Sequence, residues 1–535
     1  MSCSDIKSKS ADGKHALPDL ELQTTNQQGQ ILSLTGVNVS SNVHRTRPMT
    51  LWETISASWI ICNSWAGIAA TIALAITLGG PAILIYGPIV MFLLVGCCAI
   101  TLAELASVYP TAGGQYHWTS ILAPKKLSRG LSYFCGTVNV FSWITICSGI
   151  AIIGPQLILG MVPFFNDEYI AQPWHVFLLY QIFNLLVLLY NIFVLKHTLW
   201  VHTLALAVSI LSFAAILITC VARAPTYQES AFVWNTLLNG SGWDSDAVAF
   251  LIGLVSPNYM YAGIDGALHL AEECTNAAIV IPRALLSTIT IGFVTSFAFM
   301  IAMVYCVQDF EMVVSTSTGV PIYELWYQAT SSRTVANFFL CLLLLAVIFA
   351  LNGAHQTASR LTWSFARDSA CWGDTLIKRV HPDLEVPVYA LLVNFGIMFI
   401  IGCVYLGSTS AFNAIIGTGL TLQHMTYAIP AALVMFRKRS AKILPKNRAF
   451  AVPNALGYVA NIMTVATAVL ALVFYDFPTT LPSTGDNMSK CIVPISQESC
   501  LQFSRLWRRC FSSNGSIWLY QLVCTRQETF SWTKT

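Results

Sequence analysis

Two short stretches of polar, small and helix-breaking residues interrupt otherwise apolar runs, and their chemistry suits ligand binding. The first stretch reads Asn63-Ser64-Trp65-Ala66-Gly67-Ile68. The second reads Ser256-Pro257-Asn258 and continues Tyr259-Met260-Tyr261-Ala262-Gly263-Ile264-Asp265-Gly266. A broken helix offers unpaired amides at the start of one half and unpaired carbonyls at the end of the other. A solute that carries both charges, such as an amino acid, would satisfy both ends.

A single carboxylate, Asp265, lies in the second stretch between Gly263 and Gly266. It is the one formal charge inside the apolar runs, and a charge within a membrane is costly. Three functional roles are open for it: a counter-charge for a cation, a proton carrier, or a partner in gating. The structural alternative is a hydrogen-bond acceptor that caps the broken helix.

Other polar and aromatic residues have simpler interpretations. Because they lie at the breaks, three aromatic residues are expected to face the ligand: Trp65, Tyr259 and Tyr261. Asn139 and Trp143 are further candidates on the third apolar run. Three acids at the ends of runs are expected to pair with basic residues: Glu104, Glu272 and Glu273. Three histidines inside runs are expected to make ordinary polar contacts: His202, His355 and His424.

The composition predicts an integral membrane protein. Of the 535 residues, 55% are hydrophobic and only 10% are charged, with a mean hydropathy of +0.63. A soluble chain carries about a quarter charged residues. Eleven runs approach the roughly 20 residues that a spanning helix needs. They lie near 55–78, 82–103, 131–157, 174–195, 199–221, 247–270, 284–306, 335–357, 387–406, 411–436 and 454–475.

Charge asymmetry between the loops predicts the orientation. Lys and Arg gather in alternate loops, with the densest group at 437–448, whereas the loops between them carry mostly acids. By the positive-inside rule the N-terminus is cytoplasmic. The net charge of +3 is too small to indicate nucleic acid binding, and the cysteines follow no metal-ligand spacing. We therefore expect no metal, no cofactor and no nucleic acid partner.

The breaks fall in the first and sixth runs, which is the pattern of a five-plus-five inverted repeat. Repeat one then covers about 55–221, repeat two about 247–436, and an extra helix about 454–475. Together they form a transmembrane domain over residues 48–480, which follows a disordered cytoplasmic tail over residues 1–47.

Three further stretches resemble a known family. They are AELASVYPTAGGQYHW from Ala103 to Trp118, YAGIDGALHLAEE from Tyr261 to Glu273, and ASRLTWSFARD from Ala358 to Asp368. Together they resemble the amino acid–polyamine–organocation superfamily, and within it the fungal permeases for amino acids, GABA and choline. The resemblance implies an all-α, LeuT-like inverted-repeat bundle, usually of twelve helices. It also implies import of an amino acid or related amine by alternating access, driven by protons or by exchange, across the plasma membrane or the vacuolar membrane.

The resemblance also implies roles for individual residues. In the family, amides at the first break hold the substrate carboxylate, and the matching positions are Ser64, Trp65, Ala66, Gly67 and Ile68. Carbonyls at the sixth-helix break hold the amine, and the matching positions are Tyr259, Met260, Tyr261, Ala262 and Gly263. Tyr259 matches an aromatic that closes over the substrate, and Asp265 matches an acid implicated in gating. Many relatives read Gly-Ser-Gly where this chain has Trp65-Ala66-Gly67, so a cationic or uncharged ligand stays open.

Several alternatives remain. The chain could be a nutrient sensor that binds solute without moving it, and sodium could replace the proton as coupling ion. An enzyme is disfavoured by the lack of HExxH, GxSxG and phosphate-loop motifs, and a channel by the lack of a filter-like repeat. Residues 485–535 hold no run long enough for a twelfth helix, and we expect this tail to derive from a retained intron or shifted reading frame.

Overall fold

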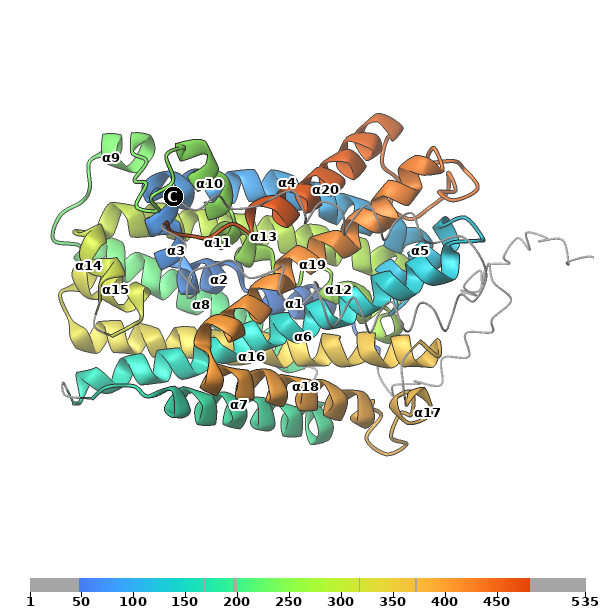
Figure 1. Ribbon diagram of the computed structural model, residues 1–535, viewed down its shortest axis with the longest axis horizontal. Coiled ribbons are helices and arrows are strands. Elements are labelled where there is room, and N and C mark those ends of the chain that lie inside the picture. Colours follow the sequence, from blue (N-terminus) through green and yellow to red (C-terminus); the bar gives the residue numbers. More distant parts are fainter. Residues whose placement is uncertain are drawn as a thin grey trace, which may run out of the picture. The chain divides into compact units, whose positions relative to one another are not determined.

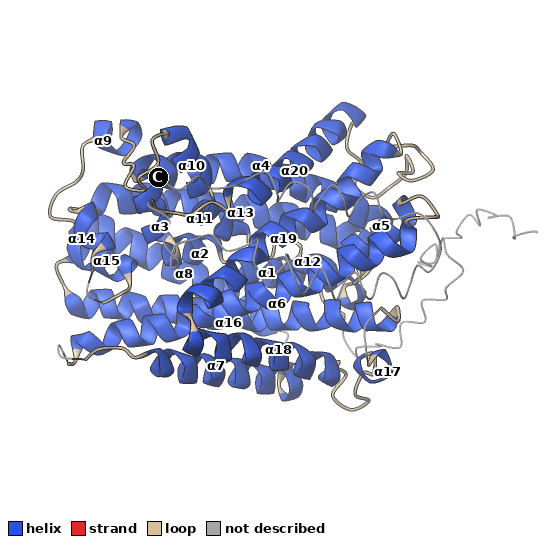
Figure 2. Cartoon of the chain, in the orientation of Figure 1, coloured by secondary structure: helices blue, strands red, loops and turns tan. Residues whose placement is uncertain are grey.

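Helices make up the described part of the chain, as Figures 1 and 2 show. The structure, a computed structural model, describes residues 48–166, 169–195, 198, 200–316, 318–370 and 373–481. Within these ranges there is no strand, and one isolated β-bridge joins Met49 to Cys274. The predicted tails at 1–47 and 485–535 lie outside the described residues.

The first five predicted spans are all present as helices. In chain order they are α1 (Leu51–Cys62) with α2 (Ser64–Ala70) and α3 (Ile72–Gly79), then α4 (Pro81–Val108), α6 (Ser128–Met161), α7 (Pro173–Phe193) and α8 (Trp200–Arg223). The first span leaves the helical conformation at Asn63 and bends by 47° at Thr71.

The next six predicted spans are present as well. They are α10 (Asp246–Gly253) with α11 (Val255–Asn258), η3 (Tyr259–Tyr261) and α12 (Gly266–His269), then α13 (Ala277–Cys306), α16 (Arg333–Arg367), α18 (Val388–Gly407), α19 (Thr409–Phe436) and α20 (Asn454–Phe474). Short helices fill the connections: α5 (Gln115–Leu122), η1 (Val162–Phe164), α9 (Ser230–Asn235), η4 (Ala271–Glu273), α14 (Phe310–Val314), α15 (Pro321–Thr330) and α17 (Asp374–Ile377).

Local signals in the sequence set where several of these helices begin. A capping box starts α1, because the Thr50 hydroxyl accepts the amide of Glu53 and the Glu53 carboxylate accepts the amide of Thr50 at 2.8 Å. Pro81 and Pro173 occupy the first turns of α4 and α7, where the missing amide hydrogen costs nothing. Along the apolar stretches that follow, the helix is the conformation that satisfies every peptide group within a membrane.

The prediction of eleven apolar spans is corrected in one respect. Nine helices of the described chain are long and apolar enough to cross a membrane, and the bent first span makes ten. The eleventh, α19, has the length but carries Gln423 and His424 near its middle. Both side chains are buried, with 1% and 2% exposure, so they face the bundle. Among the described residues, α19 therefore has the length of a spanning helix without the apolar composition of the other spans.

Helices in equivalent places of the two halves pack on each other. The second span α4 packs on the seventh, α13, the third, α6, packs on the eighth, α16, and the fourth, α7, packs on the ninth, α18. Figure 1 shows α7 and α18 running side by side. Contacts between equivalent helices are what a two-fold relation between the halves implies. The predicted all-helical membrane bundle is confirmed.

Buried ion pairs join distant segments near the ends of these helices, as expected for the three acids. The carboxylate of Glu104 on α4 accepts Arg439 Nη2 at 2.7 Å and Arg448 Nη2 at 2.7 Å. The Arg439 side chain is 0% exposed and that of Glu104 is 3% exposed. The other two acids pair with bases of α16: Glu272 with Arg367 and Glu273 with Arg360.

Replacing Glu104 with Gln should destabilise the protein strongly, because it leaves the buried guanidinium of Arg439 without a counter-charge. The expected loss is about 3–5 kcal/mol of unfolding free energy, measured as a lower unfolding temperature in detergent. Asp374→Asn is the control, since its partner Lys378 is 3.8 Å away and 42% exposed. That variant should lose less than about 1 kcal/mol. Equal unfolding temperatures for the two variants would contradict this prediction.

Candidate functional site

The first break is built around Asn63, which has a φ of 36°. Asparagine enters this left-handed region more readily than most residues. Its carbonyl accepts the amides of Ala66 at 2.8 Å and Gly67 at 3.0 Å. Its side chain donates to Ala346 O on α16 at 3.3 Å and accepts from Ser209 Oγ on α8 at 2.8 Å. The break is thus anchored on two neighbouring helices. The amides of Ser64 and Trp65, the first two of α2, have no acceptor within the helix.

The second break lies between η3 and α12. Ala262 leaves the helical conformation with ψ of 124°, and Gly263 has a φ of 80°. A Cβ at Gly263 would lie 2.9 Å from Ile61 Cγ2, so both the backbone conformation and the space require glycine here. The Gly263 amide donates to Gln423 Oε1 on α19 at 3.3 Å. This break is therefore held by α1 and α19.

The two breaks contact each other directly. The Ser64 hydroxyl donates to the Met260 carbonyl at 2.6 Å. A Cβ at Gly67 would lie 3.0 Å from the Tyr259 carbonyl oxygen, so only glycine permits this approach of the two backbones. Gly67 and Tyr259 remain partly exposed, whereas Ser64 and Met260 are buried.

The aromatic side chains expected to face the ligand divide into two groups. The Trp65 indole donates to Ser209 Oγ at 2.9 Å, and its ring lies 5.6 Å from that of Phe299 on α13. The Tyr261 hydroxyl donates to Ile289 O on α13 at 3.3 Å. Both rings are buried in helix contacts, so Tyr259 is the aromatic side chain that keeps access to the junction.

The remaining positions carried over from the resemblance contribute chiefly backbone. Ala66 and Ile68 are buried in the core beside the first break, and Ala262 is buried at the second. The structure thus brings the predicted segments together. Most side chains of these segments are buried in packing contacts.

Asp265 lies beside the second break and contacts five polar side chains. Its Oδ2 accepts from Gln115 Nε2 at 2.6 Å and from Trp143, and it lies 3.2 Å from His269 Nε2. Its Oδ1 accepts from Gln423 and Tyr427. The carboxylate is fully buried. Although Asp265 occupies the N-cap position of α12, its side chain makes no capping bond. The Asp265 side chain therefore does not act as a helix cap.

The five side chains around Asp265 come from four different elements. Gln115 lies on α5, Trp143 on α6, His269 on α12, and Gln423 and Tyr427 on α19. Asn139 on α6 extends the network, since its Nδ2 donates to Gln115 Oε1 at 3.1 Å. Asn139 and Trp143, proposed from the sequence as contributors to a ligand site, thus converge on the acid.

Sequence reasoning missed four members of this network: Gln115, His269, Gln423 and Tyr427. A signal existed for His269, because it follows Asp265 by four residues and so shares its helix face. A signal also existed for Gln423, a polar residue in the middle of an apolar run. On α5, burial lowers the pKa of His117, against the opposing attraction of Asp368.

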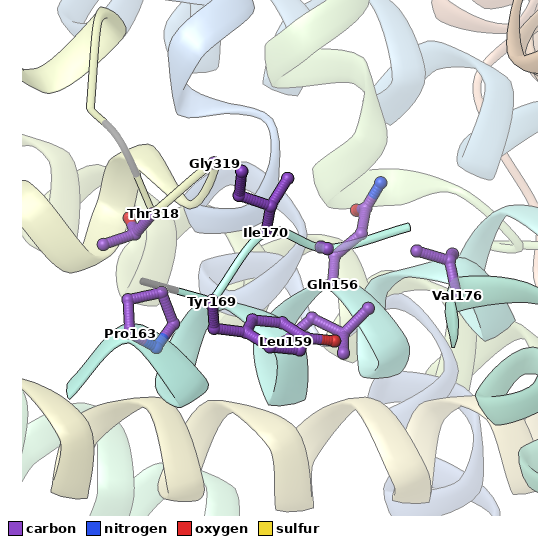
Figure 3. Close-up of a pocket in the computed structure, with 10 residues that line it drawn as sticks. Gln156, Leu159, Pro163, Tyr169, Ile170, Val176, Thr318 and Gly319 are labelled. Atoms are coloured by element: carbon purple, nitrogen blue, oxygen red, sulfur yellow. The ribbon is translucent and has the colours of Figure 1, made fainter. Parts of the chain in front are cut away.

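A cavity of about 360 Å³ lies elsewhere, at the far end of α6 (Figure 3). It is lined by residues of α6 and η1, by the segment that leads into α7, and by Thr318 and Gly319 before α15. Figure 3 shows Gln156 and Tyr169 among its lining side chains. No residue of either break lines this cavity. Across the described ranges, no group of three or more His, Cys, Asp or Glu side chains could hold a metal ion.

Comparisons with known proteins agree with this architecture. The family model described as amino acid permease matches residues 53–496. A choline transporter of Saccharomyces cerevisiae is 33% identical over 85% of this chain and 80% of its own length. A swainsonine transporter of Arthroderma benhamiae is 31% identical over 85% of this chain and 90% of its own length. A putative amino acid/polyamine transporter of Macrophomina phaseolina is 29% identical over 81% of this chain and 96% of its own length.

The matched region includes both breaks, the Asp265 network and every helix from α2 to α20. The relatives are named transporters. Nine helices of the described chain are long and apolar enough to span a membrane, or ten spans with the bent first span. The protein is thus a multi-pass membrane transporter rather than an enzyme, and the chain belongs to the amino acid permease family within the amino acid–polyamine–organocation superfamily.

Proposed function

We propose that this protein is a secondary active transporter that imports a small nitrogenous solute by alternating access, coupled to protons. The plasma membrane is the proposed location, with the N-terminus in the cytoplasm. The observation that carries the proposal is the direct backbone contact between two broken spans, at Gly67 and Tyr259. Breaks in equivalent spans of an inverted repeat are the usual position of a transporter's binding site.

The proposed solute site lies at this junction and is made mainly of peptide groups. The amides at the start of α2, from Ser64 to Ile68, form the positive end of a short helix. The end of η3, from Tyr259 to Ala262, presents carbonyls. The Ser64 hydroxyl donates to the Met260 carbonyl. A substrate amine would compete for that carbonyl. A carboxylate would bind the amides of Ser64 and Trp65, because those of Ala66 and Gly67 already donate to the Asn63 carbonyl.

A basic or quaternary nitrogen is the feature we propose the substrates to share. The named relatives carry choline, swainsonine, and amino acids or polyamines, and choline has no carboxylate. Asp265 is not available as the counter-charge, because it is fully buried and already contacts five polar side chains of the protein. Tyr259 is partly exposed, and its aromatic ring suits a cation, since ring faces attract ammonium groups.

The substitution of Trp for Gly at position 65 does not fill the proposed site. The indole is directed to Ser209 and Phe299 on α8 and α13. Trp65 therefore does not lie between α2 and η3, and its bulk does not distinguish a zwitterion from a cation as the substrate.

Competition of labelled choline uptake by amino acids, GABA and polyamines, in proteoliposomes at two external pH values, tests the proposed function. Accumulation of solute that increases at acidic external pH is expected. Binding of solute without accumulation would overturn transport and favour the sensor. Accumulation that follows a sodium gradient instead would overturn proton coupling alone.

Replacing Gly67 with Leu should abolish uptake, because even its Cβ would lie 3.0 Å from the Tyr259 carbonyl and the longer side chain would separate the breaks. We expect a loss of about a hundredfold or more, equivalent to about 3 kcal/mol. Gly96→Leu on α4 is the matched control, since a Cβ there has no atom within 4 Å. Surface expression of both variants should equal that of wild type. Wild-type uptake by the Gly67→Leu variant would count against the junction as the site.

Replacing Tyr259 should separate a ring contact from a hydroxyl contact. Tyr259→Leu removes the ring face and should raise the KM for choline about tenfold or more. Tyr259→Phe retains the ring and should stay within about threefold of wild type. A larger defect in the Phe variant than in the Leu variant would show that the hydroxyl, not the ring, binds the solute.

A further inference from the structure

The imidazole of His269 has an acceptor at each of its two nitrogens. Nδ1 lies 2.7 Å from the carbonyl oxygen of Ala112, and Nε2 lies 3.2 Å from Asp265 Oδ2. A carbonyl oxygen can only accept, so Nδ1 must carry a hydrogen. A neutral imidazole would then point a lone pair at the carboxylate. The contact is satisfied only if one extra proton is present between Nε2 and Oδ2.

We propose that Asp265 and His269 form a proton-binding site. The bound proton holds the segment around Ala112, together with α5, against α12. With the proton bound, the pair is an imidazolium facing a carboxylate. Both side chains are 0% exposed, so water does not screen the pair. Asp265 also accepts hydrogen bonds from Gln115 on α5 and from Gln423 and Tyr427 on α19. One proton therefore links elements from both halves of the bundle.

Loss of the proton to water would place two acceptors face to face. If Nε2 loses its hydrogen, its lone pair faces Asp265 Oδ2 at 3.2 Å. If Nδ1 loses it instead, the lone pair faces the Ala112 carbonyl at 2.7 Å. A buried acceptor without a donor is costly. Release of the proton thus favours separation of the Ala112 segment from α12, and separation in turn exposes the pair to water.

The other ionisable groups around the pair do not provide an alternative proton. Cys62 on α1, and Tyr427 and His424 on α19, lie close enough to interact with Asp265. Tyr427 already donates its hydroxyl to Oδ1, and His424 Nε2 contacts Asn258 at 2.8 Å.

Charged groups of the adjoining elements are already paired. The two acids that follow α12 belong to η4 and form ion pairs with α16: Glu272 with Arg367, and Glu273 with Arg360. Burial lowers the pKa of His117 on α5. Of the ionisable groups named around Asp265, only His269 contacts the carboxylate with a nitrogen that can gain or lose a proton.

This inference supplies the coupling site of the proposed function, but its test needs no transport. The purified full-length protein would be unfolded by heat in detergent from about pH 5 to about pH 9, without solute. Because the proton stabilises the packed arrangement, wild type should lose stability as pH rises and the proton is released. His269→Gln should remove this loss of stability at rising pH. The difference in pH dependence between the wild-type and variant unfolding curves should correspond to about one proton. Asp265→Asn should remove it as well.

His202→Gln is the matched control, because His202 is another buried imidazole, on α8 and outside the network. It should keep the wild-type pH dependence. An unchanged pH dependence in His269→Gln, or its loss in His202→Gln, would overturn the proton site. A merely structural role for His269 would lower the unfolding temperature equally at every pH.

In proteoliposomes, choline accumulation driven by an inward proton gradient should fall about tenfold or more in His269→Gln. It should stay within about twofold of wild type in His202→Gln. If wild type accumulates no choline, the proposed function fails, while the unfolding curves still decide the proton site.

Discussion

A peptide group that leaves the helix ladder inside a membrane must find another partner, and both breaks of this chain obey that constraint. Asn63 turns into the left-handed region, and its side chain is fixed by Ala346 O and Ser209 Oγ. The Gly263 amide is accepted by Gln423, and the Met260 carbonyl is satisfied by Ser64. Each broken span is therefore positioned by neighbouring helices. A substrate would need to replace only the bonds made between the breaks themselves.

The same constraint explains why a carboxylate is tolerated beside the second break. Taking Asp265 out of water costs several kcal/mol, and five converging donors offset this cost. Those donors come from α5, α6, α12 and α19, so the charge is stable only while these four elements stay together. A buried charge with such widely distributed partners favours one packed arrangement over others. This argues for a role in conformational change rather than in binding a cation directly.

The helices and their breaks could be predicted from the sequence, because run length and helix-breaking residues are local properties. All eleven runs are helices, and the first and sixth are interrupted at Asn63 and at Ala262–Gly263. The direction of Trp65 could not be predicted, since it depends on Ser209, which is 144 residues away. The Gln115–Asp265 and Gln423–Asp265 bonds likewise join residues 150 and 158 positions apart. Such contacts depend on the packing of the whole bundle, which cannot be predicted from the hydropathy of the sequence.

The side chain of Ile61 packs between the proposed solute site and the proposed proton site. Positions for a Cβ at Gly263, Gly266 and Gly353 lie 2.9, 2.8 and 2.8 Å from atoms of this one side chain. Ile61 thus fits against the second break, against the start of α12 and against α16, and only glycines leave room for it. Since α1 carries Ile61 and ends at the first break, a movement of α1 cannot alter the solute junction without also changing the packing beside Asp265. We infer that solute and proton would influence each other through this contact, because close-packed side chains transmit displacement instead of absorbing it.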